Sequence, residues 1–187
     1  MIDNFVFRQY GLKKGFKVFG EKGKEAAIKE MKQLHMRNCF KPLGEKELSS
    51  QDKKNALGSL IFLKEKDSGE IKGRACADGR KQREHIEKGE AASSTVSLES
   101  IVLTSVIDTE EGRDVAVINI PNAFVQTEMD KNEKVIMKLS GELAELLVTI
   151  LPKLYRKYIR IEKGKKVLYV ELLKALYDTL KISFVIL

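Results

Sequence analysis

Cysteine, histidine and tryptophan are scarce in this chain of 187 residues. It has two cysteines, two histidines and no tryptophan. Two cysteines cannot build a disulfide framework, so we expect a reduced, intracellular protein. A zinc site is not expected either, because His35 and His85 belong to no cluster of cysteines and histidines.

Long apolar runs are also missing. No run reaches the roughly 18 to 20 apolar residues that a membrane-spanning helix needs. The N-terminal segment lacks the apolar stretch and cleavage site of a signal peptide. We therefore expect no contact with a membrane.

The common catalytic motifs are absent from the sequence. There is no Gly-x4-Gly-Lys-Ser/Thr phosphate loop, no Gly-x-Ser-x-Gly nucleophile turn, no His-Glu-x-x-His and no Cys-x-x-Cys. Cys76 and His85 are nine residues apart, but His85 falls in a polar stretch, so a half-buried structural cysteine is the better interpretation. The sequence therefore gives no sign of the nucleotide-hydrolysing, hydrolase and metalloprotease classes that depend on such motifs.

The excess of positive charge is confined to the first half of the chain. The formal net charge is +7; residues 1–90 hold 21 basic and 14 acidic side chains, whereas residues 91–187 hold 13 of each. This asymmetry predicts a basic region over 1–90 that faces a polyanion and a neutral region over 91–187 that packs against it. The alternative is a lysine-rich surface that is simply solvated.

The hydrophobic pattern predicts an irregular order of helices and strands, which favours an α+β fold. Its clearest element is a β-hairpin over residues 60–77 with an Asp-Ser-Gly-Glu turn. The apolar, β-branched run at residues 114–120 predicts a buried strand. The apolar end at 184–187 has no cap or polar tail, so we expect the chain to stop inside a larger domain. Further helices are expected at residues 21–36, 97–108, 142–151 and 171–180, a short helical turn at 51–57, and strands at 135–139 and 167–170.

Three collinear blocks resemble one known family. They are Lys-x-Arg-x-x-Ala-x-Gly, then Ala-Ser-x-Thr-Val before a helix, and then a strand end followed by Ala-Phe. The blocks resemble the reverse transcriptase of Ty1/copia-type retrotransposons. The residues that match the blocks are Lys72, Arg74, Ala77 and Gly79, then Ala92, Ser93, Thr95 and Val96, then Ala123 and Phe124, with Asn119 at the strand end.

The resemblance implies part of a right-hand polymerase, with fingers over 1–90, the start of a palm over 91–187 and an incomplete sheet at the C-terminus. Such enzymes copy a template into DNA with two Mg²⁺ ions held by three carboxylates. Arg74 matches the fingers arginine that contacts the triphosphate of the incoming nucleotide. Phe124 matches the aromatic side chain that excludes a 2′-hydroxyl from the nucleotide sugar.

The sequence departs from the family at its metal site. Asn119 stands where the family has the first metal-binding aspartate, and an amide supplies no negative charge to Mg²⁺. Asp114 lies five positions earlier, which places it on the opposite face of the predicted strand. No Asp-Asp pair occurs in the chain, so the family's Tyr-x-Asp-Asp motif is missing. The resemblance thus implies a truncated reverse transcriptase with no intact catalytic residue, no bound metal and no cofactor of its own.

Two non-enzymatic alternatives remain open. The first is a fragment that binds nucleic acid weakly and without sequence preference through Lys72, Arg80, Lys81 and Arg83. The second is a fragment that depends for folding on missing polymerase segments or on another chain. Whether the basic side chains gather on one face separates the first alternative from a merely solvated surface.

Overall fold

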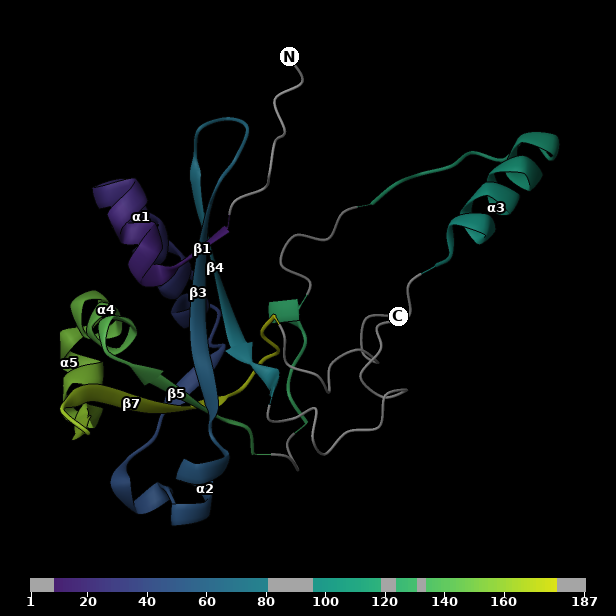
Figure 1. Ribbon diagram of the computed structural model, residues 1–187. Helices are drawn as coiled ribbons and strands as arrows, with labels where there is room; N and C mark the ends of the chain where they lie inside the picture. The colour runs from purple at the N-terminus through teal and green to yellow at the C-terminus, as the bar shows by residue number, and fades with distance from the viewer. Residues whose placement is uncertain (1–8, 81–95, 119–123, 131–133, 178–187) are drawn as a thin grey trace.

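The computed structural model of this chain describes residues 9–80, 96–118, 124–130 and 134–177 (Figure 1). These residues form a mixed α+β fold built on one seven-stranded sheet. Helical turns of the 3₁₀ type occur at Glu45–Glu47, Phe124–Gln126 and Arg156–Tyr158. The strands are β1 (Gln9–Gly11), β2 (Phe40–Pro42), β3 (Leu57–Glu65), β4 (Ile71–Asp78), β5 (Ile136–Ser140), β6 (Arg160–Glu162) and β7 (Lys165–Leu172), and the helices are α1 (Leu12–Met36), α2 (Ser50–Asn55), α3 (Leu98–Glu110), α4 (Glu142–Ile150) and α5 (Pro152–Tyr155).

Two long strands organise the sheet. β4 pairs along one edge of β3, and β1 and β5 share the other edge. β5 likewise pairs along one edge of β7, and β2 and β6 share the other. β3 and β5 run parallel, whereas the other named pairs are antiparallel. Strands from the basic first half and the neutral second half of the sequence therefore belong to one sheet, with β2 of the first half paired to β7 of the second.

The larger hydrophobic core lies on the face of the sheet that α1 and α4 cover (Figure 1). Ala27, Met31 and Leu34 recur at helical spacing on α1 and are all buried. They pack over buried side chains such as Leu63 of β3 and Leu139 of β5. The predicted helix at residues 21–36 is thus confirmed, and it extends back to Leu12 with a bend at Gly20, whose φ is 57°.

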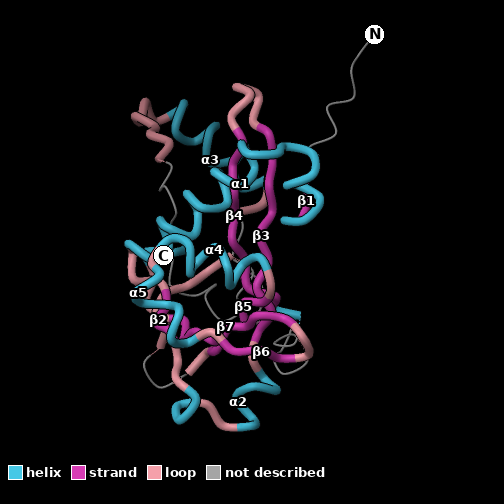
Figure 2. Tube along the Cα trace, turned by 90° about the vertical axis from the view of Figure 1, so that its left-hand side faces the viewer, coloured by secondary structure: helices cyan, strands magenta, loops and turns pink. Residues whose placement is uncertain are grey.

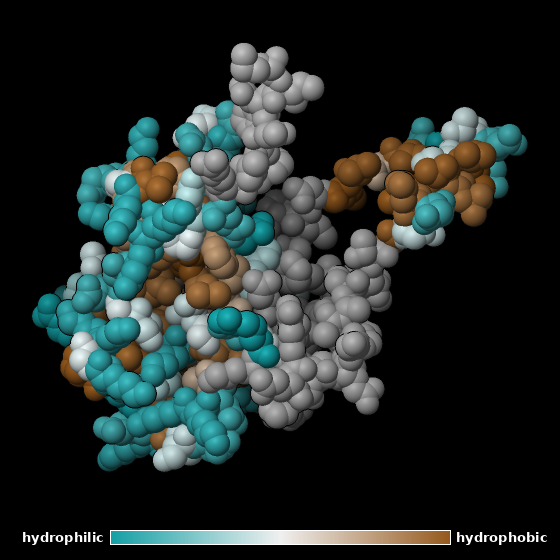
Figure 3. Space-filling model, in the orientation of Figure 1, coloured by the Kyte–Doolittle hydropathy of each residue, from teal (hydrophilic) through white to brown (hydrophobic). Residues whose placement is uncertain are grey.

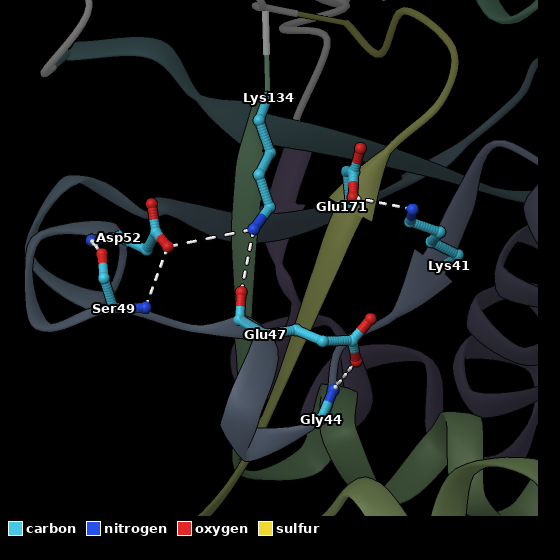
Figure 4. Close-up of polar contacts among 7 residues, drawn as sticks. All are labelled: Lys41, Gly44, Glu47, Ser49, Asp52, Lys134 and Glu171. Carbon is cyan, nitrogen blue, oxygen red and sulfur yellow. Dashed lines mark hydrogen bonds and ion pairs between the residues drawn. The ribbon is translucent and has the colours of Figure 1, made fainter.

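A smaller core lies on the opposite face of β5 and β7. Ile136 and Tyr169 point to this side, where the segment leading into α2 covers them. Figure 4 shows how that segment is held: the Lys134 ammonium donates to the Glu47 carbonyl at 2.8 Å and lies 3.9 Å from the Asp52 carboxylate. Ser49 caps α2 by accepting a hydrogen bond from the Asp52 N–H at 3.0 Å. The smaller core stops at β5 and does not include a residue of the β3–β4 hairpin.

The helix α3 stands apart from the sheet (Figure 1). The Ser97 hydroxyl caps it by accepting from the Ser100 N–H at 3.1 Å. None of its residues is buried, and Leu98 and Leu103 are 73% and 62% exposed. The helix predicted at residues 97–108 is confirmed, but it covers no part of the core in the described structure.

Several other sequence predictions are confirmed. The hairpin over residues 60–77 forms as β3 and β4, and the helical turn at 51–57 forms as α2. The strands at 135–139 and 167–170 correspond to β5 and β7, and the helix at 142–151 corresponds to α4.

The predicted buried strand at 114–120 is wrong over the five residues that the structure describes. Residues 114–118 form no strand, and Val117 and Ile118 are 97% and 83% exposed. A run of β-branched residues marks a segment that would gain from burial, but a strand also needs a neighbouring strand edge. The argument that Asp114 points away from Asn119 on a shared strand therefore has no basis, and Asn119 itself lies outside the described residues.

The predicted helix at 171–180 is also wrong over residues 171–177, which is the part of it that the structure describes. Glu171 and Leu172 continue β7, where they pair with Lys41 and Phe40 of β2. The N–H groups of Leu173 and Lys174 then donate to the Cys39 carbonyl, and Tyr177 forms a β-bridge to Cys76. Tertiary pairing with segments far away in the sequence thus overrides the local helical pattern.

No helix among the described residues is long and apolar enough to cross a membrane.

Gly73 provides a test of how closely the hairpin approaches α1. A Cβ atom at Gly73 would lie 2.9 Å from the Ala26 carbonyl oxygen of α1, and a backbone atom cannot move aside cheaply. We expect Gly73→Ala to lower the free energy of unfolding by about 2 kcal/mol, as overpacking does. Gly11→Ala is the matched control, because nothing lies within 4 Å of its added Cβ. Equal losses for the two variants in urea denaturation would contradict the close approach.

Candidate nucleic-acid interface

The β3–β4 hairpin has one covered face and one open face. Residues directly opposite each other in an antiparallel pair point to the same side. Leu63 pairs with Gly73, and Ile61 with Ala75; all four are buried and face α1. Figure 2 shows α1 alongside the two strands. The alternate residues must therefore point away from α1, to the side that the smaller core does not reach.

The open face of the hairpin is defined here as Leu60, Phe62, Lys64, Lys72 and Arg74. Lys72 and Arg74 are exposed, and Leu60 is 38% exposed. The register places Lys64 opposite Lys72, and Phe62 opposite Arg74. This face thus combines three cationic groups with an aromatic ring and an aliphatic side chain.

Lys64 and Lys72 lie directly opposite each other at the end of the hairpin next to its turn. Two positively charged side chains this close raise the positive potential at this end of the face. An approaching phosphate or carboxylate would be attracted by that potential.

Arg74 is held in position by an aromatic ring. Its guanidinium carbon lies 4.5 Å from the centre of the Tyr177 ring. The Tyr177 carbonyl accepts from the Ala77 N–H at 3.1 Å, which fixes this residue beside β4. Stacking leaves the edge of a guanidinium available for the paired N–H donors that suit phosphate.

Glu30 is an acidic group of α1 on the covered side whose carboxylate interacts with Lys72 and Arg74. Its carboxylate reaches from α1 and accepts a hydrogen bond from the Ala75 N–H at 3.0 Å. Burial raises the pKa of Glu30, while the Ala75 hydrogen bond and the charges of Lys72 and Arg74 act in the opposite direction. The two cations thus stabilise a buried carboxylate on one side of the hairpin and remain exposed on the other.

Arg80 was expected to bind nucleic acid, but its charge is compensated. Its Nε and one terminal nitrogen donate to the two oxygens of Asp78 at 2.8 and 2.6 Å. This pair raises the pKa of Arg80. Arg80 therefore contributes less to the anion-attracting field than its charge in the sequence indicates. Lys81 and Arg83 lie outside the described residues, so their predicted roles stay predictions.

The residues expected at the polymerase site are only partly described. Phe124 begins the 3₁₀ turn Phe124–Gln126, whereas Asn119 lies outside the described residues. Within the ranges that the structure covers, no group of three histidine, cysteine, aspartate or glutamate side chains is placed to hold a metal ion. The predicted arrangement of Asn119 beside Phe124 stays a prediction.

Comparison with known proteins adds no relative: no family model, no curated protein and no solved structure matches this chain.

The structure adds three residues to the site that the sequence argument did not single out. Phe62 and Lys64 could have been found by pairing the two strands of the predicted hairpin across its turn. Tyr177 could not, because it is about a hundred residues from Arg74 in the sequence, and the local pattern there predicted a helix. Contacts of that separation depend on the pairing of the whole sheet.

Glu30→Gln tests the burial of the carboxylate beside the site. A raised folded-state pKa means that the carboxyl group contributes stability below its usual pKa of 4.5 and loses it as the pH rises through the raised value. We therefore expect the neutral variant to melt at a higher temperature than the wild type at pH 7. The difference should shrink as the pH falls towards 4. A lower melting temperature of Glu30→Gln at pH 7 would contradict the assigned burial.

Proposed function

We propose that this chain is a nucleic-acid-binding polypeptide derived from a Ty1/copia-type reverse transcriptase and without polymerase activity. One observation carries the binding part of the proposal: Lys64, Lys72 and Arg74 gather on one open face of the hairpin. The alternative, a lysine-rich surface that is simply solvated, predicts that replacing these three residues has no special effect on binding.

The chemistry of the open face suits a nucleic-acid strand. Lysine and arginine side chains contact successive phosphates and release condensed counterions, which supplies affinity without sequence preference. Phe62, between these cations and Leu60, offers a ring against which an unpaired base could stack. Phosphate contacts and base stacking carry little sequence information, so we expect binding to be weak and tolerant of sequence.

The proposed origin rests on the collinear motif blocks. The hairpin that carries Lys72 and Arg74 is the part that the resemblance assigns to the fingers, and β5 to β7 fall in the part assigned to the palm. The mixed α+β sheet is compatible with that assignment and does not by itself establish it. Polymerase activity is not proposed, because Asn119 replaces an aspartate and no Asp-Asp pair occurs in the sequence.

The triple variant Lys64→Ala, Lys72→Ala, Arg74→Ala tests the binding site. Each lost phosphate contact removes about 0.7 to 0.9 from the slope of log K against log salt concentration. We expect the slope to fall by about 2 for a single-stranded oligonucleotide, measured by fluorescence anisotropy between about 50 and 200 mM salt.

Removing the same charge elsewhere is the control for that experiment. Lys46, Lys153 and Lys163 lie in the 3₁₀ turn Glu45–Glu47, in α5 and after β6, all outside the hairpin. Their joint replacement by alanine lowers the net charge equally and should change the slope by less than about 1. An equal loss in both triple variants would mean that total charge, and not the open face, determines binding.

Primer extension tests the absence of catalysis. Two-metal phosphoryl transfer needs several carboxylates that converge on ions about 4 Å apart, and this chain supplies at most one of the family's three. We expect no template-directed incorporation with Mg²⁺ or Mn²⁺, either by the wild type or by Asn119→Asp. Incorporation above a no-enzyme control by either protein would disprove the inactive state.

A further inference from the structure

Positive charge in the second half of the chain is concentrated in one short segment. Residues 151–166 carry seven basic side chains and one acidic one, although residues 91–187 as a whole are neutral. This basic segment contains α5, the 3₁₀ turn Arg156–Tyr158, β6 and the start of β7. All its basic residues except Arg160 are exposed, so they produce a positive potential around it. They are Lys153, Arg156, Lys157, Arg160, Lys163, Lys165 and Lys166.

β6 lies within this basic segment and has an open edge. It pairs with β7 (Figure 2), and within the described residues no strand pairs with its other edge. Ile161 of β6 lies opposite Lys166, whose carbonyl accepts from the Gly141 N–H at 2.8 Å on the far side of β7. Ile161 and Lys166 therefore form a non-hydrogen-bonded pair, and the N–H and C=O of Ile161 point to the open edge. Both groups are available to an added strand.

An open groove of about 380 Å³ lies beside this edge, on the side of the sheet that α4 covers. Lys166 points to that side, since its ammonium lies 3.1 Å from the Glu145 carboxylate of α4. Ile161 is directly opposite Lys166 and therefore points the same way, where it is 66% exposed. Figure 3 shows hydrophobic side chains among hydrophilic ones around α4 and α5. The groove is lined by Glu145, Val148, Thr149, Arg156, Ile159 and Lys166.

Two arginines next to the edge have no acidic partner. Arg156 lines the groove and forms no ion pair with a described residue, whereas Lys166 is already paired with Glu145. Arg160 lies on the opposite side of β6, where it also lacks an ion pair within the described structure and has one terminal nitrogen buried without a hydrogen-bond partner. An acidic ligand would compensate charges that the fold leaves uncompensated.

These features together fit an extended acidic peptide. A nucleic-acid strand would use the cations, but it would use neither the backbone groups of the edge nor the aliphatic lining of the groove. A second copy of β6 would bring one basic segment against another, which costs affinity. A short, lysine-rich edge resists pairing with a strand of like charge. A strand of opposite charge does not meet that barrier.

We propose that β6 binds an extended acidic segment of a partner protein, which adds to the sheet as an antiparallel strand. Main-chain hydrogen bonds to Ile161 supply affinity in this mode, and alternate side chains supply specificity. Directly opposite residues of an antiparallel pair point to the same side, so apolar side chains of the partner face the groove. The acidic side chains between them face Arg160, and Arg156 attracts the same negative charge. This proposal goes beyond nucleic-acid binding and does not depend on it.

Fluorescence anisotropy with the full chain and labelled peptides tests the added strand. The probe is a blocked peptide of about nine residues that alternates glutamate and valine. We expect saturable binding with a Kd of about 100 µM or tighter, and a loss of about tenfold when lysine replaces every glutamate. Methylation of the valine N–H groups should weaken binding by about tenfold, because these groups point to β6. Methylation of the glutamate N–H groups, which point away, should weaken it by less than about threefold.

Variants of the protein locate the site. Arg156→Glu should weaken peptide binding by about tenfold, and Ile161→Ser by about fivefold. Lys17→Glu and Val18→Ser on α1 are the matched controls, because both side chains are exposed and lie outside the basic segment. Each control should change the affinity by less than about twofold. Circular dichroism checks that every variant folds.

Several outcomes would overturn the proposal. Binding that does not saturate by about 1 mM would mean that the edge has no affinity for an acidic strand. Any other order of the two methylated peptides would exclude an antiparallel strand on β6. Equal losses in the variants and their controls would mean that total charge and surface hydrophobicity determine binding. Displacement of the peptide by a single-stranded oligonucleotide from the variant Lys64→Ala, Lys72→Ala, Arg74→Ala would assign the surface to nucleic acid instead.

Discussion

The close approach of α1 to β4 at Gly73 determines which side of the hairpin is left open. A side chain at this position would meet the Ala26 carbonyl, so position 73 itself has no room for a Cβ atom on the side that faces α1. Gly15 on α1 makes the reciprocal approach over Leu63 of β3. Because side chains alternate along a strand, fixing Gly73 towards the helix sends Lys72 and Arg74 to the opposite side. Packing of Gly73 against α1 thus determines which side of the hairpin carries the basic side chains.

The same approach links the stability of the fold to the charge of the open face. Glu30 can be buried because the Ala75 N–H and the charges of Lys72 and Arg74 offset the cost of desolvation. Neutralising these cations would raise the pKa of Glu30 further and favour its protonated form. The basic residues of the hairpin therefore act on both sides of the sheet, and their replacement should be judged by stability as well as by binding.

Local pattern predicted the elements whose partners are near in the sequence. The hairpin has its turn residues and alternation in one continuous stretch, and α1 shows its apolar residues at helical spacing, so both were predictable. Residues 114–118 and 171–177 failed because a strand or helix there depends on what lies beside it. The open face was half predictable: Lys72 and Arg74 stood in a visible motif, whereas the Tyr177 ring under Arg74 depends on a contact made by the completed sheet.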